Sequence, residues 1–178
     1  GAKNIFLWVQ YKSGRVIGPK KAQFHLDTAA PSLTSVTPKD QSVGVNPSDG
    51  IAVTFDEDVN TYASNGTKTF QMKADGEEIS QSVFYDTNYR KATMYGLTYG
   101  TTYSLVIDGV RDRAGNLLQT PTISFKTKPN QPTDLKANAS TGRVDLNWSA
   151  PKGAKKYNIY YRVIADTGYI PSLVKDGS

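Results

Sequence analysis

Apolar and polar residues alternate along most of this chain with a period of two, the pattern of β-strands that bury one face. The clearest run places Tyr103, Leu105 and Ile107 on the inner face and Ser104 and Val106 on the outer face. Similar short runs are separated by turn residues about every 8–12 residues, which is typical of an antiparallel sandwich. They centre on residues 51–55, 70–72, 83–85, 92–94 and 123–127. The pattern therefore predicts an all-β chain built as an antiparallel β-sandwich.

Two proline-containing linkers, residues 28–31 and 128–132, divide this pattern into three tandem modules. Residues 1–31 hold one hairpin around Ser13-Gly14 and the first linker; since two strands alone are only marginally stable, we expect the hairpin to close a preceding domain. Residues 32–128 hold a complete run of strands. Residues 129–178 supply about half of the roughly 100 residues that such a sandwich needs.

Composition removes several classes of function. The chain has no cysteine, so disulfides, thiol nucleophiles and thiolate metal sites are absent. No apolar stretch approaches the roughly 20 residues of a membrane span, and we expect no membrane insertion. The net charge is +5, but Lys and Arg are scattered through all three modules, whereas a nucleic-acid interface concentrates them in a stripe. We therefore expect no nucleic-acid partner.

Particular motifs give the three modules a family resemblance. The middle module resembles the bacterial immunoglobulin-like (Ig-like) domain of S-layer and other secreted surface proteins, on residues 37–38 (TP), 45–47 (VNP), 51–59 (IAVTFDEDV), 97–103 (LTYGTTY), 112–116 (DRAGN) and 123–127 (ISFKT). The last resembles the first half of a fibronectin type III domain, on 132–135 (PTDL), 144–148 (VDLNW) and 157–162 (YNIYYR). The first is similar to the end of another bacterial Ig-like domain, on 24–31 (FHLDTAAP).

This resemblance implies an exported, extracellular protein of the bacterial cell surface, with structural, spacer or adhesion roles in these modules. Its first partners would be the neighbouring Ig-like and fibronectin type III domains of the same polypeptide. We expect no catalysis, because His25 is the only histidine and lies on the outer face of a predicted strand, and no nucleophile, phosphate or metal motif is present.

Three residues are expected to be structural. Tyr103 fits a tyrosine corner, in which a hydroxyl near the start of the sixth strand bonds to backbone a few residues earlier. Leu105 then occupies the place where antibody domains carry a cysteine, as an apolar plug. Trp148 is expected to be structural because it belongs to the fibronectin type III signature of the last module.

An acidic group is the candidate metal site. In the sandwich topology the end of the second strand and the turn between the sixth and seventh strands lie at the same pole, which also faces the first linker. Oxygen ligands from several loops are what Ca²⁺ requires, so the sequence offers a possible structural calcium; the alternative is that these residues serve turns and solubility. The candidates are Asp27, Asp56, Glu57, Asp58, Asp112 and Asn116.

Four tyrosines are candidate ligand-binding residues, Tyr85, Tyr89, Tyr95 and Tyr99. An aromatic strip can stack on sugar rings, which makes a cell-wall polysaccharide a possible partner. The chain would then be an accessory, carbohydrate-binding module of a secreted polysaccharide-degrading enzyme. Ordinary cross-strand aromatic pairs explain the same residues more simply.

The incomplete outer modules leave a further alternative. The first module supplies the last strands of a sandwich and the third supplies the first strands, at opposite poles of the middle domain. Between molecules each hairpin could complete the next open sandwich by strand addition, a head-to-tail contact that builds filaments. The different Ig subtypes of the two ends argue against such self-association.

Overall fold

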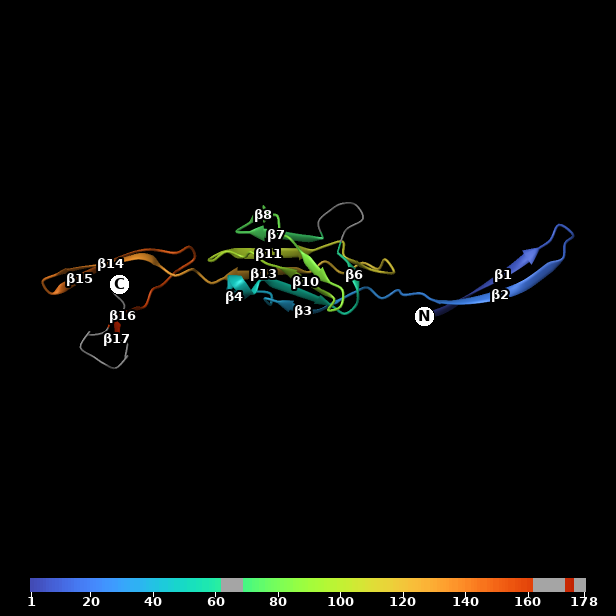
Figure 1. Ribbon diagram of the computed structural model, residues 1–178, viewed down its shortest axis with the longest axis horizontal. Coiled ribbons are helices and arrows are strands. Elements are labelled where there is room, and N and C mark those ends of the chain that lie inside the picture. The colour runs from blue at the N-terminus through green and yellow to red at the C-terminus, as the bar shows by residue number, and fades with distance from the viewer. Residues whose placement is uncertain (62–68, 162–171, 175–178) are drawn as a thin grey trace.

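A computed structural model describes residues 1–61, 69–161 and 172–174, and it confirms the all-β fold. Within these residues the regular structure consists of β-strands and one short 3₁₀ turn, η1 (Pro47–Asp49) (Figure 1). No helix in this described part is long and apolar enough to cross a membrane.

The middle of the chain forms a sandwich of two facing sheets that share one hydrophobic core (Figure 1). The first sheet has the order β3 (Leu33–Thr37), β5 (Ile51–Phe55), β10 (Lys91–Met94) and β9 (Phe84–Asp86). The second has the order β4 (Ser42–Val45), β13 (Thr122–Thr127), β11 (Thr102–Ile107), β7 (Phe70–Ala74) and β8 (Glu77–Ile79). Neighbouring strands are antiparallel except β4 and β13, which are parallel.

Alternation along the strands builds the core as the sequence predicts. On β11, Tyr103, Leu105 and Ile107 are all at most 2% exposed, and β5 buries every second residue in the same way. β7 and β8 are joined at Asp75-Gly76, both with positive φ, which is the backbone of a tight hairpin turn. The Ig-like sandwich is therefore specified by its periodic pattern and its turn residues.

The chain enters the sandwich at one end and leaves it at the other (Figure 1). The entry end lies where β3 begins, beside the short pair β6 (Val59–Asn60) and β12 (Arg111–Asp112). The exit end lies where β13 finishes, close to the turn that precedes β11. Each end of the sandwich thus faces one of the flanking modules.

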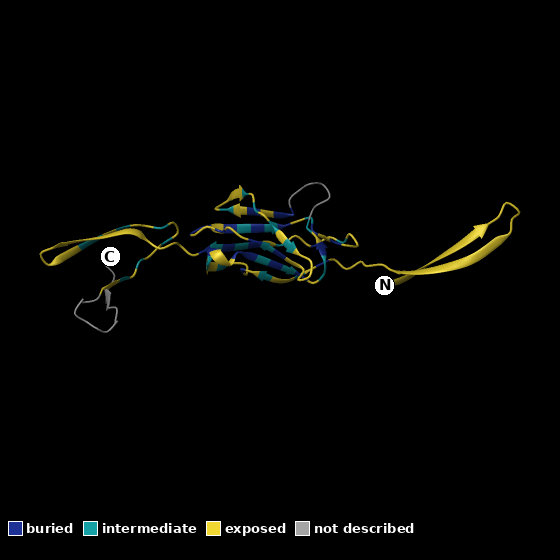
Figure 2. Ribbon diagram, in the orientation of Figure 1, coloured by how far each residue is buried: buried dark blue, intermediate teal, exposed yellow. Residues whose placement is uncertain are grey.

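The N-terminal module is a single hairpin of β1 (Ala2–Gln10) and β2 (Val16–His25), paired around the predicted Ser13-Gly14 turn. Every residue of the two strands is exposed, including the apolar side chains of both faces (Figure 2). That this hairpin closes a preceding domain stays a prediction.

The C-terminal module pairs β14 (Thr133–Ser140) with β15 (Arg143–Ser149), and β16 (Ile159–Tyr161) with β17 (Ser172–Val174). Trp148 on β15 is half-buried, and its ring meets that of Tyr157 edge-on with centroids 5.1 Å apart. Residues 162–171 and 175–178 of the predicted fibronectin half-domain lie outside the described residues, so that assignment also stays a prediction.

Candidate functional site

Three carboxylates converge at the entry end of the sandwich. Asp27 directly precedes the first linker, Glu57 follows β5, and Asp112 ends β12; one oxygen from each lies within 4.8 Å of the other two. Asp112 is buried, and Asn116 fixes its carboxylate through the backbone N–H at 2.8 Å and Nδ2 at 2.7 Å. We call Asp27, Glu57 and Asp112 the carboxylate cluster.

Asn116 also ties the first linker to this end. Its Nδ2 donates a 3.3 Å hydrogen bond to the backbone carbonyl of Asp27, besides the bond to Asp112. The turn at residues 112–116 thereby holds the residue before the linker against the sandwich, through a side chain that the sequence had suggested only as a metal ligand.

The other two predicted acidic residues are engaged elsewhere. Asp56 accepts hydrogen bonds from the N–H and the hydroxyl of Ser32, at 2.8 and 2.7 Å, and these bonds lower its pKa. Asp58 pairs with the guanidinium of Arg113, which holds the pKa of Asp58 below its usual value, and accepts a bond from the Tyr85 hydroxyl. Of the six candidates, four therefore gather and two do not.

The carboxylate cluster concentrates negative charge. Burial first, and then the charges of Asp112 and Asp27, raise the pKa of Glu57. Burial would also raise the pKa of Asp112, but the hydrogen bonds from Asn116 and the turn hold it below its usual value. Oxygen ligands from three separate segments suit a hard divalent cation such as Ca²⁺. These residues could therefore hold the predicted calcium.

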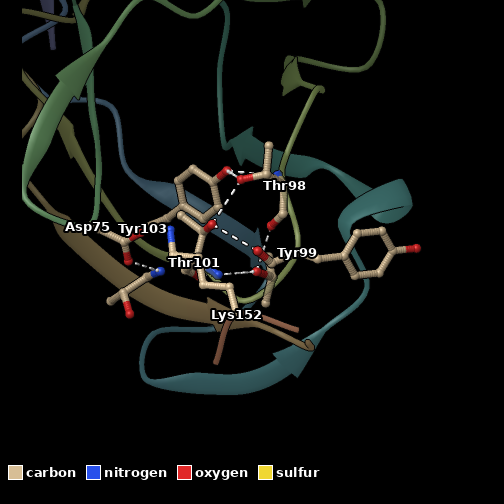
Figure 3. Close-up of polar contacts among 8 residues, drawn as sticks. Asp75, Thr98, Tyr99, Thr101, Tyr103 and Lys152 are labelled. Carbon is tan, nitrogen blue, oxygen red and sulfur yellow. Dashed lines mark hydrogen bonds and ion pairs between the residues drawn. The ribbon is translucent and has the colours of Figure 1, made fainter. Parts of the chain in front are cut away.

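The exit end is built from hydroxyl groups instead. The Tyr103 hydroxyl accepts a 2.8 Å hydrogen bond from the backbone N–H of Thr98, five residues earlier, the geometry of a tyrosine corner (Figure 3). The Thr98 hydroxyl bonds to both Tyr103 and Thr101, while Thr127 donates to the Thr98 carbonyl. The buried Tyr103 ring stacks on Phe125 at 5.4 Å.

This hydrogen-bonded turn contacts the C-terminal module directly. Gly100 and Gly153 both have positive φ, and a Cβ placed on Gly100 would overlap the carbonyl oxygen of Lys152. The Lys152 ammonium pairs with Asp75 at 2.5 Å and holds the pKa of that carboxyl below its usual value (Figure 3). We call the contact of Asp75 and Gly100 with Lys152 and Gly153 the exit joint.

The sequence did not predict the exit joint, because its residues lie in three turns far apart in the chain, and Asp75 and Lys152 are separated by 77 positions. The Asp75-Gly76 and Lys152-Gly153 turns were visible, but nothing in either indicates the other.

The four candidate tyrosines do not form one strip. Tyr85 is half-buried and points inward, with an edge contact to Phe55 at 6.2 Å. Tyr89, Tyr95 and Tyr99 are 73%, 54% and 41% exposed. Only Tyr85 and Tyr89 line a common groove, and its other aromatic member is Phe84, which the sequence reasoning missed.

Comparison with known sequences identifies the middle module. The family described as bacterial Ig-like domain matches residues 27–127, more than half of the chain, and the range includes the carboxylate cluster and Tyr103. The chain belongs to the bacterial Ig-like domain family. This confirms the resemblance drawn from the middle module's motifs, and Ig-like domains are a non-enzymatic kind of fold.

Several solved structures are also similar to this member of the family. The crystal structure of the S-layer protein rSbsC(31-844) is 20% identical, with a TM-score of 0.40, over 82% of this chain and 22% of that one. Domains 1-6 of the surface layer protein SbsC are 20% identical, with a TM-score of 0.40, over 75% of this chain and 20% of that one. The N-terminal part of the bacterial S-layer protein SbsC is 19% identical, with a TM-score of 0.41, over 82% of this chain and 37% of that one.

This Ig-like chain therefore spans less than two fifths of each of these S-layer structures. A search of curated protein sequences gives no match.

Proposed function

We propose that this chain is a non-catalytic structural spacer within a secreted, multidomain protein of the bacterial cell surface. The observation that carries the proposal is that each end of the sandwich makes specific contacts with the module next to it. A spacer must transmit orientation from one module to the next, which requires contacts across each linker in addition to the covalent connection.

At the entry end, the support comes from a hydrogen bond that involves the linker backbone. Asn116 donates to the carbonyl of Asp27, and Ser32, the first residue after the linker, is held by both oxygens of Asp56. The linker residues 28–31 are thus fixed to the sandwich on either side, which restricts the directions in which the preceding hairpin can point.

At the exit end, the support comes from close backbone packing. The approach of Gly100 to Gly153 leaves no space for a side chain on Gly100, and the Asp75–Lys152 ion pair lies beside it. A close contact of this kind fixes the distance and angle between two modules more tightly than exposed side chains do, since flexible side chains can rearrange while packed backbone cannot.

A non-catalytic role agrees with the chemistry of the titratable groups. His25 is exposed on β2, and the acidic residues at the entry end bond to Ser32, Arg113 and Asn116. A general acid or base needs a reacting group within hydrogen-bond reach in a plausible substrate pose. In our proposal these carboxylates hold the entry end of the sandwich together and do not take part in a reaction.

Small-angle X-ray scattering of the 178-residue chain across a range of concentrations tests the proposal. We expect a monomeric rod whose longest dimension is several times its cross-section, because both joints keep the modules in line. A compact particle, or a broad average over bent shapes, would contradict the spacer. Concentration-dependent growth into filaments would favour strand complementation between molecules instead.

A further inference from the structure

An open groove of about 660 Å³ lies at one edge of the four-stranded sheet. Side chains of β9, of the turn at residues 87–90 and of β10 line it. None of them belongs to the carboxylate cluster or to the exit joint. The proposed spacer function therefore does not explain this groove.

Two aromatic rings stand at this groove in unusually exposed positions. Phe84 is 63% exposed and Tyr89 is 73% exposed. Phe84 lies opposite Thr93 in the β9–β10 pair, so its direct cross-strand neighbour is not aromatic. The described ring contacts at this edge involve Tyr85 and Phe55 instead. Cross-strand aromatic pairing therefore does not account for Phe84 and Tyr89, and exposed rings beside polar groups are typical of binding surfaces.

The polar side chains beside the rings are mixed in sign and rich in hydrogen-bonding capacity. Asp86 lies directly opposite Lys91 in the strand register, which makes the groove locally close to neutral. Thr87 adds a hydroxyl group that can both donate and accept, and the Thr93 hydroxyl, which donates to the Phe84 carbonyl at 3.4 Å, can still accept. A ligand with many hydroxyls, each also donor and acceptor, is complementary to this set.

Two other polymer classes suit the groove less well. Nucleic acid binding draws its affinity from an excess of Lys and Arg over phosphates, and the Asp86–Lys91 pair removes that excess. Strand addition by a peptide requires a long row of unpaired backbone groups, and β9 is only three residues long.

We propose that this groove binds a neutral β-1,4-linked glycan chain. The apolar faces of two sugar rings stack on Phe84 and Tyr89, while the sugar hydroxyls bond to Asp86, Lys91 and Thr93. A β-1,4 linkage gives a flat, extended ribbon, and such a ribbon can lie along the outer face of a sheet edge. The site adds a binding function to the spacer, and either role can fail without the other.

The test is a titration of the uniformly ¹⁵N-labelled 178-residue chain, followed by NMR, with cellohexaose and with chitohexaose at millimolar concentration. We expect chemical-shift changes confined to residues 84–93 with at least one of the two sugars. Phe84→Ala and Tyr89→Ala should each weaken binding about tenfold, the loss of roughly one aromatic contact. Because both rings are exposed, the variants should keep a dispersed spectrum and the wild-type melting temperature.

Tyr99→Ala is the matched control, since Tyr99 is exposed but does not line the groove. It should bind as the wild type does. The absence of shifts with both sugars would overturn the proposal. So would shifts centred elsewhere on the sandwich, or binding that survives both groove variants. Preferential binding of a single-stranded oligonucleotide at the same residues would replace the glycan with a nucleic acid.

Discussion

The two ends of the sandwich contact their neighbouring modules through different kinds of interaction. The entry end gathers three carboxylates around a linker that one asparagine holds, so its stability depends on charge. The exit end uses a buried tyrosine hydroxyl, three threonine hydroxyls and two glycines in contact, so its stability depends on shape. The stability of the entry end should therefore change with pH and with added cations. The exit end should instead be sensitive to substitutions that change the volume of a side chain.

The largest effect on stability is expected at the exit end, from Tyr103→Phe. The substitution leaves the Thr98 N–H without its partner, at a cost of about 1–3 kcal/mol in the free energy of unfolding. Chemical denaturation measures it, with Tyr99→Phe as the control because that ring is exposed. An unchanged midpoint for Tyr103→Phe would mean that the corner contributes nothing to the rigidity of this end.

The next largest effect is expected at the entry end, from calcium. If the carboxylate cluster holds Ca²⁺, millimolar CaCl₂ raises the melting temperature, because a ligand that binds only the folded state stabilises it by mass action. At a concentration about ten times the Kd the gain is about 1.4 kcal/mol. Asp112→Asn should remove the shift.

Asp58→Asn should keep that shift, since Arg113 already holds the Asp58 carboxylate. A melting temperature that does not respond to CaCl₂ in the wild type would eliminate the calcium site. The stability of the entry end would then depend on the protonation of its carboxylates and not on calcium.

A smaller effect follows from the pKa of Glu57, which burial and the neighbouring carboxylates raise above the usual value of 4.5. A carboxyl with a raised folded-state pKa destabilises the fold once it is ionised, and the fold regains that stability as the pH falls through the raised pKa. Glu57→Gln should therefore raise the melting temperature at pH 7 in calcium-free buffer, on the order of a few degrees.

The gain from Glu57→Gln should vanish below pH 4.5, where the wild-type side chain is also neutral. Thermal melts from pH 4 to pH 8 measure the difference. A variant that is less stable than the wild type at pH 7 would contradict the repulsion among the three carboxylates.

The smallest effect on stability is expected from Lys152→Gln. The Asp75–Lys152 pair is exposed, and exposed ion pairs contribute little because water and salt screen them. The melt should not move measurably. A large loss of stability would mean that the exit joint depends on charge after all, which would erase the contrast between the two ends.

The two ends also differ in how far the sequence predicts them. The tyrosine corner was predictable because Tyr103 sits in an alternating strand at a fixed offset from a known turn. The acidic residues were only partly predictable. Asp56, Glu57 and Asp58 lie in the bend between β5 and β6, where the strand period no longer fixes the direction of each side chain. The structure places Glu57 in the cluster and gives the other two separate partners.

The exit joint and the groove could not be predicted for a different reason. Periodicity identifies which residues face inward, but it does not say which exposed turns meet. The contact of Gly100 with Gly153 depends on how the third module leaves the second, which no local pattern encodes. Phe84 lies between Val83 and Tyr85 in a predicted strand, and its position beside the groove follows only from the β9–β10 pairing.

If packed contacts fix the modules to each other, the distance between the sandwich and the third module has a narrow distribution. Two spin labels measure that distance, one at Glu78 on the sandwich and one at Thr141 in the β14–β15 turn. Both residues are exposed, and since the chain has no cysteine, two introduced cysteines carry the only labels. Pulsed electron–electron double resonance then measures the distribution of distances between the two labels across the exit joint.

We expect a narrow distribution for the wild type and a broad one for Gly100→Ala, whose methyl group overlaps the carbonyl oxygen of Lys152. Gly115→Ala is the matched control. Its φ is also positive and the space around it is open, so it carries the backbone strain without the clash and should keep the distribution narrow. A wild-type distribution as broad as that of Gly100→Ala would contradict the claim and leave the two modules as independent domains on a flexible linker.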